Sequence, residues 1–207
     1  MCEPTFLIAK TSPHFLVFYH DGYLRLSMKE FDIHGKREVH LTNSHVQVKV
    51  EGFSMEQHLW SFRDLQEYLD LHRPIDGHEF ISKKLVPFIQ KVGLLIAHTA
   101  KPVVTGAPSN FLMMGLDFMV TSDLQLQFIE VNNYPLWPRG TRVMDSMLTQ
   151  MGNDMFDLLF DCRYNPDEFQ RNMQYGARYG SWTLIWNELH SKCSGSPPYN
   201  PCQEFPL

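Results

Sequence analysis

The sequence predicts an α+β fold in which a mostly antiparallel sheet is flanked by helices. Three features of the 207 residues predict this fold. Short aromatic-rich runs separated by turn residues open the chain, two stretches with helical periodicity follow, and two further apolar runs are joined by the segment TSDLQ. Since tight turns connect antiparallel strands, we expect hairpins rather than a parallel sheet.

The N-terminal part is expected to contribute three strands. Asp21 and Gly22 separate the runs FLVFYH and YLRLSM, and an Asp-Gly pair between apolar runs is typical of a β-hairpin turn. A third strand is expected in REVHLTNSHVQVKV, where Val46, Val48 and Val50 would share one face because side chains alternate along a strand.

Two helices are expected next. Apolar residues recur at helical spacing from Met55 to Leu69, and Ser54 is placed to cap the helix. A second helix is predicted over residues 77–99. Pro87 lies inside it and is expected to kink or divide it, because proline has no backbone N–H to donate.

The second half begins with the strands FLMMGLDFMV and LQLQFIEVNN, which are followed by a helix over residues 141–159 with an apolar stripe. Beyond NPDEF the pattern weakens, apart from a short helical piece near GSWTLIWNELH and a proline-rich, irregular tail. We therefore expect a first unit at residues 1–160 and a helical piece with a tail at 161–207.

Composition and charge limit the classes of partner. A hydrophobic content of 43% suffices for a packed core, and a net charge of -5 provides no general basic field, so neither nucleic acid nor a membrane surface is expected as a partner. No run reaches the roughly 18 apolar residues of a membrane helix. Four cysteines without a CxxC pair favour a reduced, cytoplasmic protein.

The last two strands carry a pair of acidic residues that can be placed opposite each other. If residues 122–125 form a four-residue loop, Val120 faces Gln127 and Asp117 faces Glu130. Like charges in such a pair destabilise a sheet unless something compensates them. Asn132 lies two residues after Glu130, and therefore on the same face.

Two interpretations of this acidic pair remain open. Two carboxylates and an amide oxygen form a hard-oxygen set that suits Mg²⁺, which keeps further positions for phosphate oxygens. Alternatively, Asp117 and Glu130 mark the solvated ends of two strands, and Asn132 and Asn133 make turn contacts before Pro135.

A second polar set lies in the expected third strand. His40, Thr42 and Ser44 would share one strand face and could present hydroxyl and imidazole groups to a phosphate. Arg25, in GYLRLS, is a single cation on a neighbouring strand. For each of these residues a solvated surface position is the alternative interpretation.

Three motifs together resemble one known family. The segments DGYLRLS, HLTNSHVQ and MMGLDFMVTSDLQLQFIEVNNYP, with G-x-D-F-M followed by E-V-N-x-x-P, resemble the tubulin–tyrosine ligase-like family over about residues 6–160. The family's catalytic domain is of the ATP-grasp type. The resemblance implies that residues 1–160 form the C-terminal lobe of such a domain.

The resemblance implies a role for each candidate residue. Asp117, Glu130 and Asn132 would hold the Mg²⁺ that bridges the ATP phosphates. Thr42 and Asn43 would contact ATP near those phosphates.

Arg25 is implied to engage the γ-phosphate of ATP or the carboxylate of an incoming free amino acid. The family activates a protein carboxylate as an acyl phosphate, and the amine of the amino acid then displaces phosphate. The resemblance thus implies a ligase that adds tyrosine, glutamate or glycine to tubulin or another acidic protein tail, in the cytoplasm, at the cytoskeleton or in a cilium.

An alternative follows from where this sequence departs from the family. MCEPT stands where family members have a Lys/Arg-Phe-Asp-x-Arg strand, and the upstream phosphate-binding lysines are lacking. The chain is therefore also interpreted as a truncated, catalytically inactive binding module. A ligase with a substrate other than tubulin is a further alternative.

Overall fold

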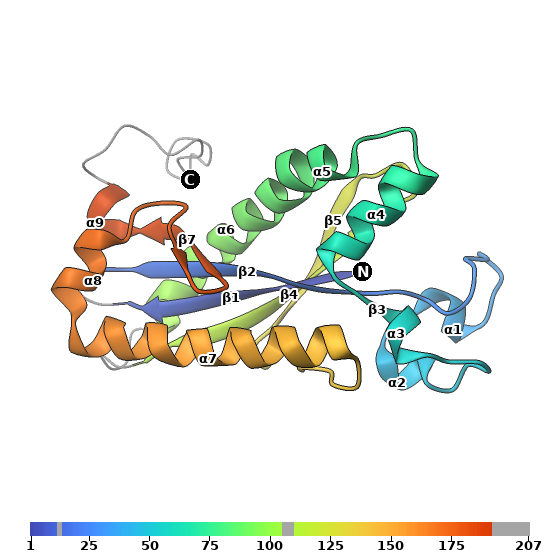
Figure 1. The fold of residues 1–207 in the computed structure, drawn as a ribbon, viewed down its shortest axis with the longest axis horizontal. Coiled ribbons are helices and arrows are strands. Elements are labelled where there is room, and N and C mark those ends of the chain that lie inside the picture. The colour runs from blue at the N-terminus through green and yellow to red at the C-terminus, as the bar shows by residue number, and fades with distance from the viewer. Residues whose placement is uncertain (12–13, 105–109, 192–207) are drawn as a thin grey trace.

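The computed structural model describes residues 1–11, 14–104 and 110–191. Within these residues a seven-stranded antiparallel sheet is covered by helices on both faces, which confirms the α+β prediction (Figure 1). The strand order is β5-β4-β1-β2-β7-β6, and β3 pairs with β2 at one end. The strands are β1 (Cys2–Lys10), β2 (Leu16–Arg25), β3 (Leu59–Trp60), β4 (Leu112–Val120), β5 (Leu126–Asn132), β6 (Arg178–Tyr179) and β7 (Trp182–Asn187).

The helices form two layers and a separate small group at one end of the sheet. The short helices α1 (Arg37–His40), α2 (Ser44–Gln47) and α3 (Met55–His58) lie together beyond the end of β2 (Figure 1). The others are α4 (Phe62–His72), α5 (Gly77–Phe80), α6 (Val86–Val104), α7 (Arg142–Tyr164), α8 (Pro166–Asn172) and α9 (Glu188–Ser191).

Alternation along β1 divides the core into two clusters. All nine residues of this central strand are buried. Phe6 and Ile8 pack with α4 and α6 on one face, whereas Leu7 and Ala9 pack with α7 on the other. Each face of β1 therefore has its own helical cover, and the face under α7 also carries the site described below.

The Asp-Gly pair is not a hairpin turn, and that prediction is wrong. β2 runs continuously through it, and Glu3 pairs with Tyr23 while Thr5 pairs with His20, so Asp21 and Gly22 are opposite one residue of β1. This is a β-bulge, which inserts one extra residue into a strand. β1 and β2 do form an antiparallel pair, but β1 ends at Lys10 and β2 begins at Leu16, so the chain passes from one to the other before the Asp-Gly pair.

The bulge needs glycine. Gly22 has φ of +69°, and a Cβ added there would overlap the backbone carbonyl of Glu3. The bulge also exchanges the two faces of β2: Phe18 before it and Tyr23 after it both belong to the core under α7, although they are an odd number of positions apart. Arg25, two residues after Tyr23, is thereby placed on the α7 face.

The predicted third strand is also wrong, because its residues form α1, α2 and the loop between them. The buried side chain of Gln47 explains the difference. Its amide donates to the Glu38 and Leu41 carbonyls and accepts from the Met28 N–H at 2.8 Å, so one side chain satisfies three separate backbone groups. Val48 and Val50, expected to share one strand face, differ in burial: Val48 is 55% exposed and Val50 is buried.

Both predicted middle helices are interrupted. The first divides into α3 and α4 around β3, because Ser61 starts a new helix through a reciprocal capping box with Asp64. The second contains a π-helical turn at Ile81–Leu85 between α5 and α6, just before Pro87. The expectation that this helix is divided near Pro87 is confirmed.

The C-terminal part joins the same sheet. α7 confirms the predicted helix, and the boundary expected at residue 160 falls inside it. The helical piece expected near residues 180–190 is wrong over most of its length, since Trp182–Asn187 forms β7 and pairs with β2. The expected irregular tail lies largely outside the described residues. None of the described helices is long and apolar enough to cross a lipid bilayer.

Replacing Gly22 with alanine should destabilise the fold by about 3 kcal/mol or more, because left-handed strain and a clash with backbone act together. The free energy of unfolding in urea measures this. Gly52→Ala is the matched control: Gly52 has φ of +75° but no atom within 4 Å of an added Cβ. It should lose only about 1 kcal/mol, and equal losses in the two variants would contradict the bulge as the cause.

Candidate functional site

The site begins with the pair Asp117 and Glu130, which face each other across β4 and β5 as predicted. The route to this pairing differs from the prediction. At the turn, Val120 faces Leu126, one residue away from the predicted register. Ile129 is then an extra residue in β5, and this second bulge brings Glu130 back opposite Asp117. The predicted pair is therefore confirmed, although the predicted loop register is wrong.

Asn132 lies on the same face as Glu130 and opposite Gly115 of β4. Gly115 has no side chain, and a Cβ placed there would lie 2.8 Å from the Cβ of Pro135, which packs over it. The Asn132 side chain is close enough to Asp117 to act on the pKa of that carboxyl, which it lowers against the larger effect of burial. The structure thus brings together all three of the predicted oxygen donors.

Arg25 joins this group from β2. Its Nη2 lies 3.2 Å from Oδ2 of Asp117 and 3.1 Å from Oε2 of Glu3, a residue of β1. The Tyr23 hydroxyl donates to the same Glu3 oxygen at 2.7 Å. Since the Glu3 and Asp117 side chains are only 4% and 5% exposed, these are buried charged contacts rather than surface ion pairs.

Negative charge exceeds positive charge in this cluster. Burial raises the pKa of Asp117; Arg25 opposes this rise, and Glu130 adds to it. Burial likewise raises the pKa of Glu3, against the effects of Arg25 and Tyr23. The cluster therefore contains three carboxylates, two of them buried, and the Arg25 guanidinium contacts the two buried ones.

The donor set fits a magnesium ion. Two facing carboxylates, a neighbouring amide oxygen and uncompensated negative charge are what a hard divalent cation requires. Among the described residues no three His, Cys, Asp or Glu side chains form a complete metal centre. The ion would therefore take Asp117, Glu130 and Asn132 from the protein and its remaining oxygens from a ligand.

Among the described residues, no hydrogen bond joins the side chain of Thr42 or Asn43 to these carboxylates. They lie in the loop between α1 and α2, where Thr42 is half-buried and Asn43 is exposed. His40, Thr42 and Ser44 share no strand face, because the expected strand does not exist there.

The segment that carries Thr42 and Asn43 is nevertheless attached beside Arg25. His58 bonds through Nδ1 to the carbonyl oxygen of Leu26 at 2.6 Å and through Nε2 to the Ser44 hydroxyl at 3.0 Å. Leu26 directly follows Arg25, so this buried histidine joins the start of α2 to the end of β2.

Three residues of the site region were missed by sequence reasoning: Glu3, Tyr23 and His58. Glu3 had one usable signal, since it is an acid within the apolar run that forms a central strand, where an unpaired carboxylate is costly. Tyr23 and His58 carried no local signal, because their roles depend on strands and loops distant in the sequence.

Comparison with known proteins identifies relatives of this chain. The sequence profile described as "Tubulin-tyrosine ligase family" matches residues 6–171. Over 181 residues the chain is 29% identical to Tubulin glycylase 3A of Drosophila melanogaster, covering 84% of this chain and 18% of that protein. It is 22% identical to Protein monoglycylase TTLL8 of Mus musculus, covering 94% of this chain and 22% of the relative.

A third relative is the Inactive polyglycylase TTLL10 of Homo sapiens, which is 26% identical over 75% of this chain and 24% of its own length. The chain therefore spans about a quarter or less of the length of these three relatives.

Arg25→Ala should destabilise the protein by about 3 kcal/mol at pH 8, because Glu3 and Asp117 would remain buried without a cation. The loss should shrink as the pH falls towards about 5. The folded-state pKa values of Glu3 and Asp117 are already raised while Arg25 is present. Between pH 8 and pH 5 the folded variant therefore binds protons that the unfolded chain does not bind, and its stability rises as the pH falls.

Urea denaturation at the two pH values measures this effect. The control is Arg63→Ala, which breaks the exposed Arg63–Glu67 pair and should change stability by less than about 0.5 kcal/mol at either pH. A loss for Arg25→Ala that does not depend on pH would mean that the buried carboxylates are not its cause.

Proposed function

The chain belongs to the tubulin-tyrosine ligase family, and from this premise we propose that it carries the metal- and phosphate-facing part of an ATP-dependent ligase. The ligase would join an amino acid to a carboxylate on tubulin or another acidic protein tail. One observation carries the proposal: Arg25, Asp117, Glu130 and Asn132 come from three strands and gather on one face of the sheet.

Asp117, Glu130 and Asn132 would hold Mg²⁺, which when bound neutralises charge on phosphate oxygens. The remaining roles belong to the protein's own groups. In the Arg25 side chain, only Nη2 contacts other described residues. The Nε of Arg25 is buried and has no hydrogen-bond partner among the described residues. Its guanidinium therefore keeps N–H donors for an oxyanion, either a phosphate or the carboxylate of an incoming amino acid.

Residues 1–160 would supply the C-terminal lobe of the catalytic domain, with Thr42 and Asn43 contacting ATP near its phosphates. Each of the three relatives above is named as a glycylase, and the name of one of these relatives describes it as inactive. We therefore propose glycine as the amino acid. Tubulin as the acceptor would associate the protein with the cytoskeleton.

A catalytically inactive binding module is the second candidate. Two observations favour it. One relative is named an inactive polyglycylase, and the Glu3 carboxylate of the chain itself already contacts Nη2 of Arg25, where a ligand oxyanion would bind. Such a module would keep the fold and bind an acidic tail without transferring an amino acid.

A transfer assay separates the two candidates. The 207-residue chain is incubated with ATP, Mg²⁺, tubulin and radiolabelled glycine, tyrosine or glutamate, and incorporation into tubulin is counted. The ligase proposal expects ATP-dependent incorporation of glycine, reduced at least about 100-fold in Glu130→Gln, with Glu67→Gln as an exposed control. Tubulin binding without any incorporation would support the inactive module.

Metal binding can be tested independently of transfer. Mn²⁺ substitutes for Mg²⁺ and is detected by electron paramagnetic resonance, in the presence of ATP to supply phosphate oxygens. Asp117→Asn should weaken Mn²⁺ binding by about tenfold or more, because a charged ligand is replaced by a neutral one. The control is Asp70→Asn, on the exposed surface of α4. If both variants bind Mn²⁺ as the parent chain does, the metal assignment is wrong.

A further inference from the structure

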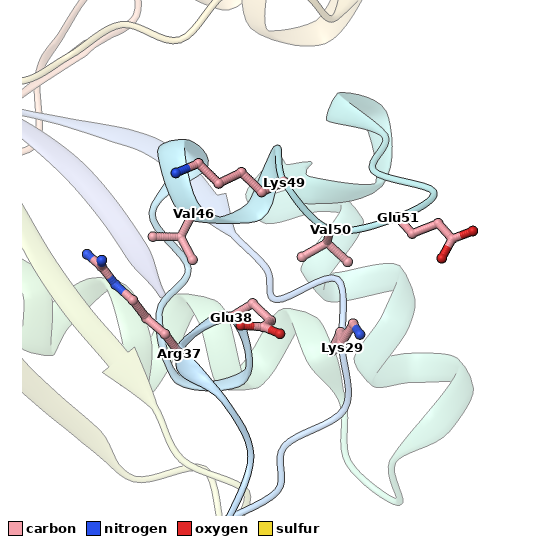
Figure 2. A pocket seen from close by; sticks show the side chains of 7 residues that line it. All are labelled: Lys29, Arg37, Glu38, Val46, Lys49, Val50 and Glu51. Carbon is pink, nitrogen blue, oxygen red and sulfur yellow. The ribbon is translucent and has the colours of Figure 1, made fainter.

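A pocket lies in the small helical segment beyond the end of β2. Figure 2 shows this pocket, which has a volume of about 270 Å³ and is formed by the loop after β2, by α1, and by α2 with the residues that follow it. Its lining residues are Lys29, Arg37, Glu38, Val46, Lys49, Val50 and Glu51. None of them has been given a role in the site above.

The walls of this pocket are held in place by the buried amide of Gln47. That side chain bonds to the Met28 N–H from the loop after β2 and to the Glu38 carbonyl from α1, both at 2.8 Å. Because Gln47 itself belongs to α2, one residue connects all three walls. The pocket is therefore a fixed feature of the fold rather than a gap between loose loops.

The pocket carries cations without partners. Lys29, Arg37 and Lys49 are exposed, and none of them forms an ion pair with another described residue. In Figure 2, Arg37 and Lys49 extend to the same side of the pocket, whereas Glu51 points away from them. Three cations against two carboxylates give a local excess of positive charge in a chain whose net charge is -5. This side of the pocket thus favours an anion.

The pocket is also close to the proposed reacting centre. Lys29 is four residues after Arg25, so their Cα atoms are at most about 14 Å apart. An extended peptide covers about 3.3 Å per residue. A residue four or five positions from a carboxylate bound at Arg25 would therefore reach the wall of the pocket that contains Lys29. Val46 and Val50 offer apolar surface for the methylene groups of a glutamate.

We propose that this pocket is a subsite for an acidic acceptor peptide, in which Arg37 and Lys49 bind glutamate side chains a few residues away from the modified carboxylate. This inference rests on the proposed function for the identity of the acceptor. The binding step itself requires neither ATP nor metal. The subsite would set the register of the acceptor on the sheet face and select tails that carry several acids in succession.

Fluorescence anisotropy with the 207-residue chain tests this without ATP. The probe is a fluorescein-labelled peptide of about eight consecutive glutamates, long enough to span both sites. The double variant Arg37→Gln with Lys49→Gln should bind at least about tenfold more weakly. The matched control is Arg63→Gln with Lys83→Gln, which removes the same charge from exposed positions on α4 and the π-helical turn, and it should stay within about twofold.

Three outcomes would overturn the subsite. The first is an unchanged affinity for the peptide in the pocket variant. The second is an equal loss of affinity in the control variant, which would indicate an effect of bulk charge alone. The third is displacement of the peptide by ATP in the parent chain but not in the pocket variant, which would indicate a nucleotide site. Glu67→Gln, at an exposed position of α4 outside both sites, should bind the peptide as the parent chain does. If the parent chain binds the peptide through the pocket but transfers no amino acid, the proposed ligase function fails and the subsite stands.

Discussion

The contact on which the rest of the site depends is the guanidinium of Arg25 between Glu3 and Asp117. Three carboxylates from three neighbouring strands lie on one side of the sheet, and two of them are almost completely buried. Without a cation among them, this end of the sheet would contain uncompensated charge in a low-dielectric environment. The arginine balances only part of this charge, and the remaining negative charge supports the proposal that a divalent ion binds there.

The site as a whole exists only because two strands each contain one extra residue. The Gly22 bulge in β2 turns Arg25 towards α7, and the Ile129 bulge in β5 turns Glu130 to the same side. Side chains alternate strictly in a regular strand, so loss of either bulge would move the residue to the opposite face. The fold thus assembles the site through strand register, and the helices α4, α6 and α7 only cover the result.

Sequence reasoning found those parts of the site that depend on local pairing. The pairing of Asp117 with Glu130 was predicted correctly although the predicted turn register was off by one residue, because the Ile129 bulge, which the sequence does not reveal, compensates for that difference. The expected strand containing Thr42 failed because Gln47 satisfies backbone groups from separate segments, a long-range effect that valine alternation cannot indicate. Glu3 was missed because its partners, Arg25 and Asp117, meet it only in the folded sheet.

The bulge at Gly22 also affects how this chain is compared with its relatives. A bulge is a one-residue insertion relative to a regular strand, and at identities of 22–29% the position of such an insertion in an alignment is easily shifted by one. A shift of one residue in this strand would equate Leu24, a residue of the opposite core, with the arginine of the site. Alignments through residues 20–25 are therefore best anchored on the glycine that the backbone requires, and not on the hydrophobic pattern around it.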